Sequence, residues 1–172
     1  MAQLVALLRA VNVGGTGMLS MRDLVSIATE AAFSNPRTYI QSGNLLFESS
    51  LPAAVAKKRL EEALLKETGK PVAVAMRTAA QLRQIEARNP FPSKAASQVA
   101  VIFLLKTVSD PALDAITGTA GEQVRSAGTE IYLYYPEGMG KSKLKLPKSA
   151  LEGTARNMNT VSKLVALCKA SA

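Results

Sequence analysis

The chain has 172 residues, of which 48% are hydrophobic and 20% are charged, which is enough for a globular core and excludes a disordered chain. The chain has no histidine, which excludes imidazole-based catalytic triads. Its single cysteine, Cys168, excludes cysteine-cluster metal sites and a disulfide within the chain. We therefore expect no metal and no cofactor. The formal charge of +8 is concentrated in residues 138–172, which carry seven basic residues against one acidic residue.

The first part of the chain predicts six elements in the order strand, helix, strand, strand, helix, strand. They are a strand over 4–10, a helix over 20–32, strands over 38–41 and 44–47, a helix over 52–69 and a strand over 72–76. Ser20 and Asp23 have capping-box spacing at the first helix, and Ser42-Gly43 predicts a tight turn between the paired strands. This order is that of the ferredoxin-like fold.

The rest of the chain predicts a second unit with a less regular order. Its elements are a helix over 78–88, a strand over 99–105, a short helix from Asp110, hairpin strands over 123–125 and 131–135, a Gly- and Lys-rich segment over 136–153 and a final helix. Thr78 and Gln81 fit a capping box at the first of these helices. We therefore predict a mixed α/β (α+β) fold with two ferredoxin-like βαββαβ-type halves, residues 1–77 and 78–172, the second of them degenerate.

Two glycine-rich loops match known phosphate-binding motifs only in part. Gly-Lys-Ser at 140–142 follows a strand, but Tyr135 stands where a P-loop needs glycine, which excludes a nucleotide-triphosphatase loop. The glycines of this loop free backbone N–H groups while Lys141 and Lys143 add charge, so weak anion binding stands beside an ordinary solvated loop. The glycines over 14–17 lack the third glycine of the dinucleotide fingerprint and favour a tight turn.

A polar run surrounds the predicted start of the last helix. Arg156, Asn157 and Asn159 lie there, and a guanidinium beside a helix N-terminus is a ready anion site. Helix capping explains part of the run, because Asn is a common N-cap. Met158 and Cys168 fall on the apolar face of this helix, so we interpret both as core residues and the thiol as inert.

Five motifs follow one another along the chain. They are Ala6-Leu-Leu-Arg-Ala-Val-Asn-Val-Gly-Gly15, Arg37-Thr-Tyr-Ile-Gln-Ser-Gly-Asn44, Asn89-Pro-Phe91, Tyr135-Pro-Glu-Gly-Met-Gly-Lys-Ser-Lys-Leu144 and Thr154-Ala-Arg-Asn-Met-Asn-Thr-Val-Ser-Lys-Leu164. Together they resemble the bacterial family called domain of unknown function 1697, over nearly the whole chain. That family usually has Trp where this chain has Met158, which removes an aromatic ring that could stack on a ligand. The resemblance implies ferredoxin-like halves and brings no established activity, so no functional residue is carried over.

Polar residues and glycines concentrate at the ends of the predicted strands and helices, where α/β folds place ligands. The candidate ligand-binding residues are Arg9, Asn12, Tyr39, Ser42, Asn44, Lys141, Lys143, Arg156, Asn157 and Asn159. We expect them to converge on one anion-binding site, and no catalytic residue can be named. Turn formation and helix capping are the alternative role for many of them.

The leading hypothesis for the ligand is nucleic acid or a nucleotide-like phosphate, because clustered positive charge favours such partners. Tyr39 and Tyr132 lie on predicted strands, and ferredoxin-like sheets can stack bases on strand aromatics. The alternative is an enzyme acting on a small phosphorylated or carboxylated metabolite, with the loop lysines stabilising charge, Arg156 as anion clamp and Tyr135 as proton donor. A protein-interaction module is a third class, and it would expose an apolar patch.

The N-terminus has no basic leader before its apolar stretch, and no apolar run approaches the roughly 18 residues that span a bilayer. We therefore expect a cytoplasmic protein with no membrane partner. The oligomeric state stays open, and a monomer is compatible with the sequence.

Overall fold

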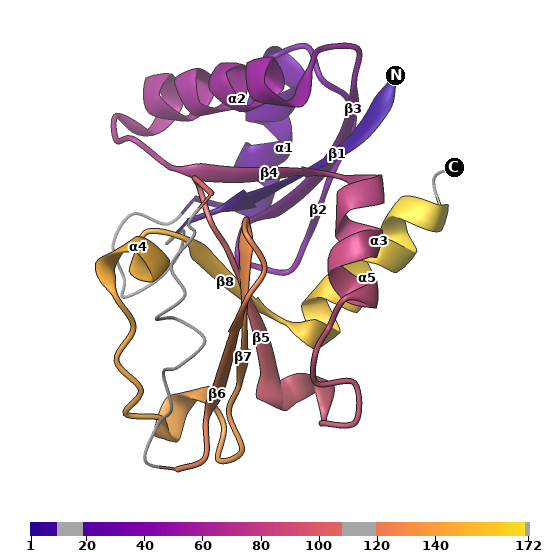
Figure 1. Cartoon of the computed structure of the whole chain (residues 1–172). Coiled ribbons are helices and arrows are strands. Elements are labelled where there is room, and N and C mark those ends of the chain that lie inside the picture. Colours follow the sequence, from indigo (N-terminus) through magenta and orange to yellow (C-terminus); the bar gives the residue numbers. More distant parts are fainter. Residues whose placement is uncertain (10–18, 108–119, 171–172) are drawn as a thin grey trace. The chain divides into compact units, whose positions relative to one another are not determined.

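The computed structural model describes residues 1–9, 19–107 and 120–170. Its contacts divide the chain into two compact units, one ending at Gln81 and the other running over Leu82–Ala170. We refer to them as the first half and the second half. Each half contains its own four-stranded antiparallel sheet (Figure 1).

The sheet of the first half has the strand order β2-β3-β1-β4. Its strands are β1 (Ala2–Leu8), β2 (Ser34–Tyr39), β3 (Asn44–Ser49) and β4 (Val74–Thr78). β1 is central and pairs with both β3 and β4. β2 starts earlier than the sequence predicts, since Pro36 is expected to interrupt regular structure. The proline is tolerated because β2 is an edge strand, where a missing N–H need not leave a partner strand unpaired.

Helices α1 (Met21–Glu30) and α2 (Ala53–Thr68) cover one face of this sheet (Figure 1). The predicted start of α1 is confirmed, because the Ser20 hydroxyl accepts the Asp23 N–H at 2.9 Å. The predicted end of α2 is also confirmed, because Gly69 closes this helix with φ of +73°. The core between helices and sheet includes the rings of Phe33 and Phe47, which are tilted at 31° to each other with their centroids 4.3 Å apart. The first half is thus a ferredoxin-like unit.

The sheet of the second half has the order β6-β7-β5-β8, which is the order of the first sheet repeated. Its strands are β5 (Val99–Phe103), β6 (Gln123–Ser126), β7 (Glu130–Tyr134) and β8 (Thr154–Asn157). The helix predicted from Asp110 lies outside the described residues. The repeated order confirms the prediction of two ferredoxin-like halves.

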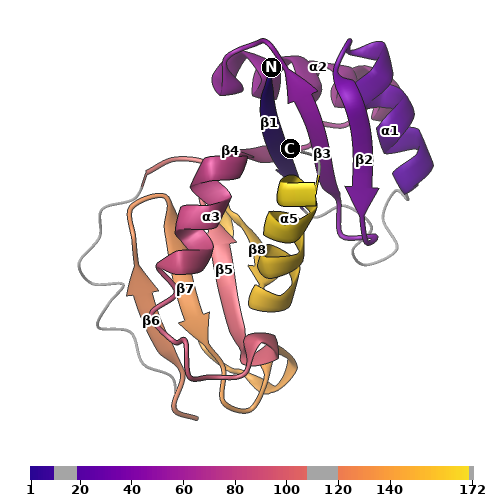
Figure 2. The same ribbon diagram turned by 90° about the vertical axis from the view of Figure 1, so that its right-hand side faces the viewer.

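Helices lie on both faces of the second sheet. α3 (Ala79–Ala87) and α5 (Met158–Ala170) cover one face (Figure 2). The short α4 (Lys148–Leu151) lies on the other, where Ala150 packs in a core with residues of β5, β6 and β7. The capping box at α3 is confirmed, since Thr78 N–H donates to Gln81 Oε1 at 2.8 Å and Gln81 N–H donates to Thr78 Oγ1 at 3.1 Å. The described residues of the second half also contain the 3₁₀ turns η1 (Ala96–Gln98) and η3 (Met139–Lys141).

The polar run before the last helix contains a strand that the sequence does not predict. β8 pairs with β5, with Arg156 opposite Val101. β8 has only four residues, and its two buried side chains are polar, so the sequence shows no alternation of apolar residues that would predict a strand. For this reason the sequence alone indicates the start of a helix in this run. Arg156 stands two residues before the start of α5, as the sequence predicts, but it lies in a strand and its side chain is buried.

Candidate functional site

In the first half, the candidate residues lie at one end of the sheet. Leu8, the last residue of β1, donates its N–H to the Gly43 carbonyl at 2.9 Å, which places the end of β1 beside the turn between β2 and β3. Arg9 is exposed and follows directly. Tyr39 and Asn44 face each other across the same turn. Asn12 lies outside the described residues.

The Asn44 side chain has a structural role. It is fully buried, and its Nδ2 donates to the Tyr39 carbonyl at 2.9 Å and to Ser42 Oγ at 3.0 Å. The amide therefore closes the turn from within. Of the candidates in this half, Asn44 and Ser42 hold the turn, and Arg9 presents an exposed positive charge at its side.

The turn is longer than the predicted two-residue hairpin, because it spans four residues between β2 and β3. Ile40 opens it with φ of +53° and Gly43 ends it with φ of +83°. A β-branched residue in the left-handed region is a strained conformation, and Ile40 is also 46% exposed. No local sequence signal marks such a residue, since isoleucine normally favours extended backbone.

In the second half, the Arg156 side chain is turned inward. It is 7% exposed, and its Nη1 donates to Thr154 Oγ1 at 2.7 Å and to the Ala155 carbonyl at 2.8 Å. Burial lowers the pKa of Arg156 to about 10, so the guanidinium remains charged at neutral pH. Asn157 Oδ1 accepts the Thr160 N–H at 2.9 Å and caps α5, whereas Asn159 is exposed.

Tyr132 cannot stack on a ligand, contrary to the hypothesis drawn from its position on a strand. It is 2% exposed, and its hydroxyl donates to the Ile85 carbonyl of α3 at 2.6 Å. Burial raises the pKa of Tyr132 to about 12. The face of the sheet that carries this ring is covered by helices of its own half.

The Gly- and Lys-rich loop forms a row of exposed lysines, which we call the basic segment, residues 138–148. From residue 141 to residue 146, exposed lysines alternate with half-buried side chains. Leu144 and Leu146 pack against the core of the second half, and Lys143 and Lys145, which alternate with them, are exposed to solvent. The basic segment carries four lysines and no acidic residue.

A buried carboxylate fixes the start of this row. Ser142 Oγ donates to Glu122 Oε1 at 2.8 Å and accepts the Leu144 N–H at 3.1 Å. Hydrogen bonds from the backbone N–H of Glu122 itself and from the Ser142 hydroxyl lower the pKa of Glu122. The basic segment is therefore anchored to β6 by an ionised group.

Sequence reasoning missed this anchor and two of the lysines. Glu122 and Ser142 are 20 positions apart, and nothing in either neighbourhood signals the pairing. Lys145 could have been found, because alternation of lysine with leucine over 143–146 is a period-of-two pattern typical of a chain with one face packed, whereas Lys148 stands outside this pattern.

The structure offers less support for the enzyme alternative. Burial, followed by the nearby Glu122 charge, raises the pKa of Tyr135, which makes its phenol a poorer proton donor. Arg156, the expected anion clamp, directs two hydrogen bonds at its own strand. Within the described ranges, no group of three or more His, Cys, Asp or Glu residues is placed to hold a metal ion.

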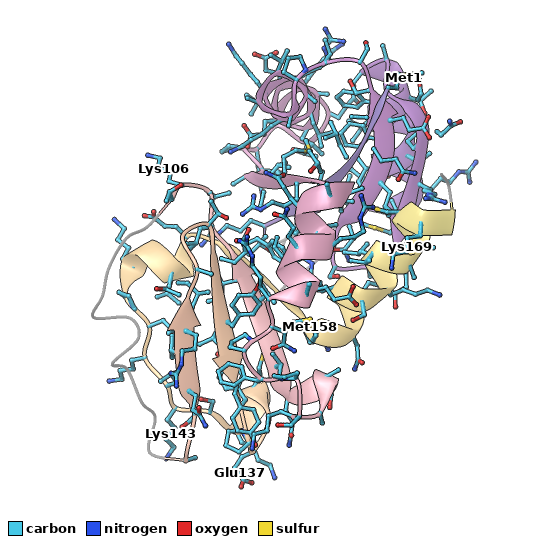
Figure 3. The ribbon with its side chains drawn as sticks, turned by 45° about the vertical axis from the view of Figure 1, so that its right-hand side comes forward. Met1, Lys106, Glu137, Lys143, Met158 and Lys169 are labelled. Atoms are coloured by element: carbon cyan, nitrogen blue, oxygen red, sulfur yellow. The ribbon has the colours of Figure 1, made fainter. Side chains whose placement is uncertain are left out.

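The candidate residues thus fall into two groups, one in each half. In the second half, Lys141 and Lys143 follow β7, whereas Asn157 and Asn159 follow β8. The two lysines and the two asparagines lie at the same end of the second sheet, the end where β5 starts. They are on different sides of it, because β7 and β8 flank β5 on opposite edges. Figure 3 shows Lys143 at this end of the second sheet. In the described part of the chain, none of the helices has the length and apolarity needed to cross a membrane.

Comparison with known proteins identifies a family and a similar fold. Residues 1–132 match the family described as Protein of unknown function (DUF1697). No match is found among curated proteins. The conserved bacterial protein SP0830 from Streptococcus pneumoniae has a similar solved structure, with 20% sequence identity and a TM-score of 0.76 over 97% of this chain and 98% of that chain, a likeness in fold alone. Because the matched region spans most of its length, this protein belongs to the DUF1697 family.

Proposed function

We propose that this protein binds a phosphate-bearing anion, a nucleic acid or a nucleotide-like phosphate, through the basic segment. The observation that carries the proposal is the outward row of Lys141, Lys143 and Lys145 above leucines that are packed in the core. In the described part of the chain, none of these three lysines forms a salt bridge. Ammonium groups that form no salt bridge keep their attraction for an external anion.

The positions of these charges are also restrained before any ligand arrives. The Ser142–Glu122 hydrogen bond holds one end of the row, and Leu144 and Leu146 hold the middle. A restrained backbone loses less conformational entropy on binding than a free loop does. This distinguishes the basic segment from an ordinary solvated loop with mobile lysines.

The test compares two variants with equal net charge. In one, Lys141, Lys143 and Lys145 are replaced by glutamine. In the other, the same change is made at three exposed lysines of the first half, Lys58, Lys66 and Lys70. Binding of a fluorescent oligothymidylate of about 12 nucleotides and of tripolyphosphate is measured at about 50 mM salt.

We expect the first variant to lose most of its affinity for whichever probe the wild type binds, and the second to lose little. Equal losses in both variants would mean that the whole positive charge of the protein acts, and the proposed site would be wrong. The absence of binding by the wild type to either probe would also overturn the proposal. Melting temperatures of both variants check that the fold is intact.

A further inference from the structure

The lysines of the basic segment stand in a line and do not converge on a point. Lys141 is the last residue of η3, and Lys143 and Lys145 follow it; all three are exposed, and one half-buried residue separates each from the next. The backbone is extended at both ends of this stretch, with φ of −74° and ψ of 136° at Ser142 and φ of −66° and ψ of 160° at Pro147. Two residues of extended chain advance about 7 Å, so where the backbone is extended the Cα atoms of successive lysines are separated by roughly that distance.

A line of single charges fits a chain of single charges. A lone phosphate is held by donors that converge on its oxygens, often bidentate arginines, and this row has neither feature. A nucleic-acid backbone carries one negative charge per nucleotide, and proteins that follow a single strand use a positive track along it. The geometry therefore favours a linear polyanion over a free nucleotide.

Apolar side chains stand at both ends of the row. Met139 precedes Lys141 by two residues and is 49% exposed, and Leu151, at the end of α4 beyond the basic segment, is 59% exposed. Each offers apolar surface to a flat, unstacked base, and the polarisable thioether of methionine suits contact with an aromatic ring. Bases are accessible in this way on a single strand, whereas a duplex stacks them inside.

A membrane surface fits this segment less well. A peripheral membrane segment places a broad apolar face between its charges and buries it in the bilayer. Here the leucines between the lysines, Leu144 and Leu146, already pack against the core of the second half. Only the two terminal side chains remain to contact an apolar phase.

Resting on the proposed function, we infer that the ligand of the basic segment is single-stranded nucleic acid. Three lysines contact three successive phosphates, and Met139 and Leu151 contact bases at the ends. Recognition depends on the backbone and on base faces, so it does not depend on sequence. Lys148 contributes less, because its Nζ lies 3.9 Å from a carboxylate oxygen of Glu152.

Salt dependence and ligand class test the inference with the wild-type protein. For three phosphate contacts on a single strand, the dissociation constant is expected to rise about 20-fold between roughly 50 and 200 mM salt. The variant with Lys141, Lys143 and Lys145 replaced by glutamine should lose this dependence. A duplex of the same length and linear polyphosphate, compared at equal phosphate concentration, should both bind more weakly than the single strand.

A second pair of variants separates base contacts from charge. Replacing Met139 and Leu151 by glutamine should weaken binding of the single strand several-fold and leave polyphosphate binding unchanged. The matched control replaces Val55 and Leu65 of the first half, which are 47% and 48% exposed, by glutamine. This control should change the binding of neither the single strand nor polyphosphate.

The outcomes distinguish the inference from the proposed function. If the duplex or polyphosphate binds as tightly as the single strand, or if the Met139 and Leu151 variant binds the single strand unchanged, the inference is wrong and the proposed function stands. Tight binding of anionic lipid vesicles with no binding of the single strand would likewise reject the inference. If no probe binds in a lysine-dependent way, both are wrong.

Discussion

Ile40 is the residue whose conformation is least expected from its type. Its φ of +53° places a β-branched side chain in the left-handed region, where the Cβ crowds the following carbonyl. Asn35 and Ala32 also have positive φ, but asparagine tolerates this region and alanine has no branch at Cβ. Among the described residues with positive φ, Ile40 is therefore the one whose side chain is least suited to its backbone conformation.

Replacing Ile40 with asparagine should stabilise the protein. We expect the free energy of unfolding to rise by about 1 kcal/mol, because asparagine adopts the left-handed conformation at lower energy and little packing is lost at an exposed site. Urea denaturation measures the change. Ile40→Val keeps the branched Cβ and should show no gain. A loss of stability in Ile40→Asn would mean that the isoleucine side chain makes contacts worth more than the strain.

The Tyr132 hydroxyl has a defined structural role at the end of a helix. It donates to the carbonyl of Ile85, which lies in the last turn of α3, where helix carbonyls lack a partner within the helix. Removing the hydroxyl leaves a carbonyl unsatisfied. The ring that the sequence offers for ligand stacking is therefore a part of the core.

Tyr132→Phe should lower the free energy of unfolding at pH 7 by about 1–2 kcal/mol, the usual result of losing a buried hydrogen bond. The pKa of Tyr132 is raised by burial to about 12, above its ordinary value of 10, so the folded protein holds this proton more tightly than the unfolded chain. The stability from this group is fully present below pH 10 and is lost as pH rises through 12. Urea denaturation at several pH values should show the wild type approaching the variant above pH 10. A constant difference would contradict the raised pKa.

At the scale of elements, prediction from sequence succeeds where the signal is local. The ends of α1, α2 and α3 follow from residues that act within four positions of one another, such as Ser20 with Asp23 and Thr78 with Gln81. β8 and the Glu122–Ser142 anchor could not be predicted, because both depend on partners far away in the sequence. For the same reason Lys141 and Lys143 were identified from the sequence, whereas the hydrogen bond that holds their segment was not.

Gly153 shows how closely two elements approach in the second half. A Cβ at this position would lie 2.7 Å from the Phe103 carbonyl oxygen and 2.7 Å from Ile102 Cγ2. The glycine therefore lets the link between α4 and β8 pass directly against β5. The close contact is with backbone, which cannot move aside as a flexible side chain can.

Gly153→Ala should lower the free energy of unfolding by about 1–3 kcal/mol, as overpacking of a well-packed site does. Gly140 is the matched control, since a Cβ there would meet nothing within 4 Å. Gly140→Ala should be neutral or slightly stabilising through the unfolded state. Thermal or urea unfolding of both variants compares them. Equal effects at the two positions would show that the close approach at Gly153 has no energetic consequence.

At the scale of the molecule, the two halves repeat one plan in the register of their strands. Across β2, β3, β1 and β4 one row of paired residues reads Arg37, Leu46, Val5 and Arg77. Across β6, β7, β5 and β8 the corresponding row reads Arg125, Tyr132, Val101 and Arg156. Each row begins and ends with arginine. Element order predicts the repeat, but its register depends on strand pairing, which the sequence does not reveal.

Each half also has a core of its own, and this leads to a prediction about how the protein unfolds. Leu60 of α2 is fully buried in the first core, and Ile131 of β7 is fully buried in the second. Truncating either to alanine removes comparable volume and should destabilise its surroundings by about 2–5 kcal/mol. Because opening free energies follow cooperative units, the loss should be greatest in the sheet that shares the altered core.

Hydrogen exchange of backbone amides in the two variants tests this. Leu60→Ala should speed exchange most in β1, β3 and β4, and Ile131→Ala should do so most in β5, β7 and β8. Each variant is the control for the other, since both remove a large aliphatic side chain from a fully buried site. If either substitution speeds exchange equally in both sheets, the two cores unfold as one unit. In that case a weakened core in the first half would also release the basic segment, and variants there would lose anion binding without touching a lysine.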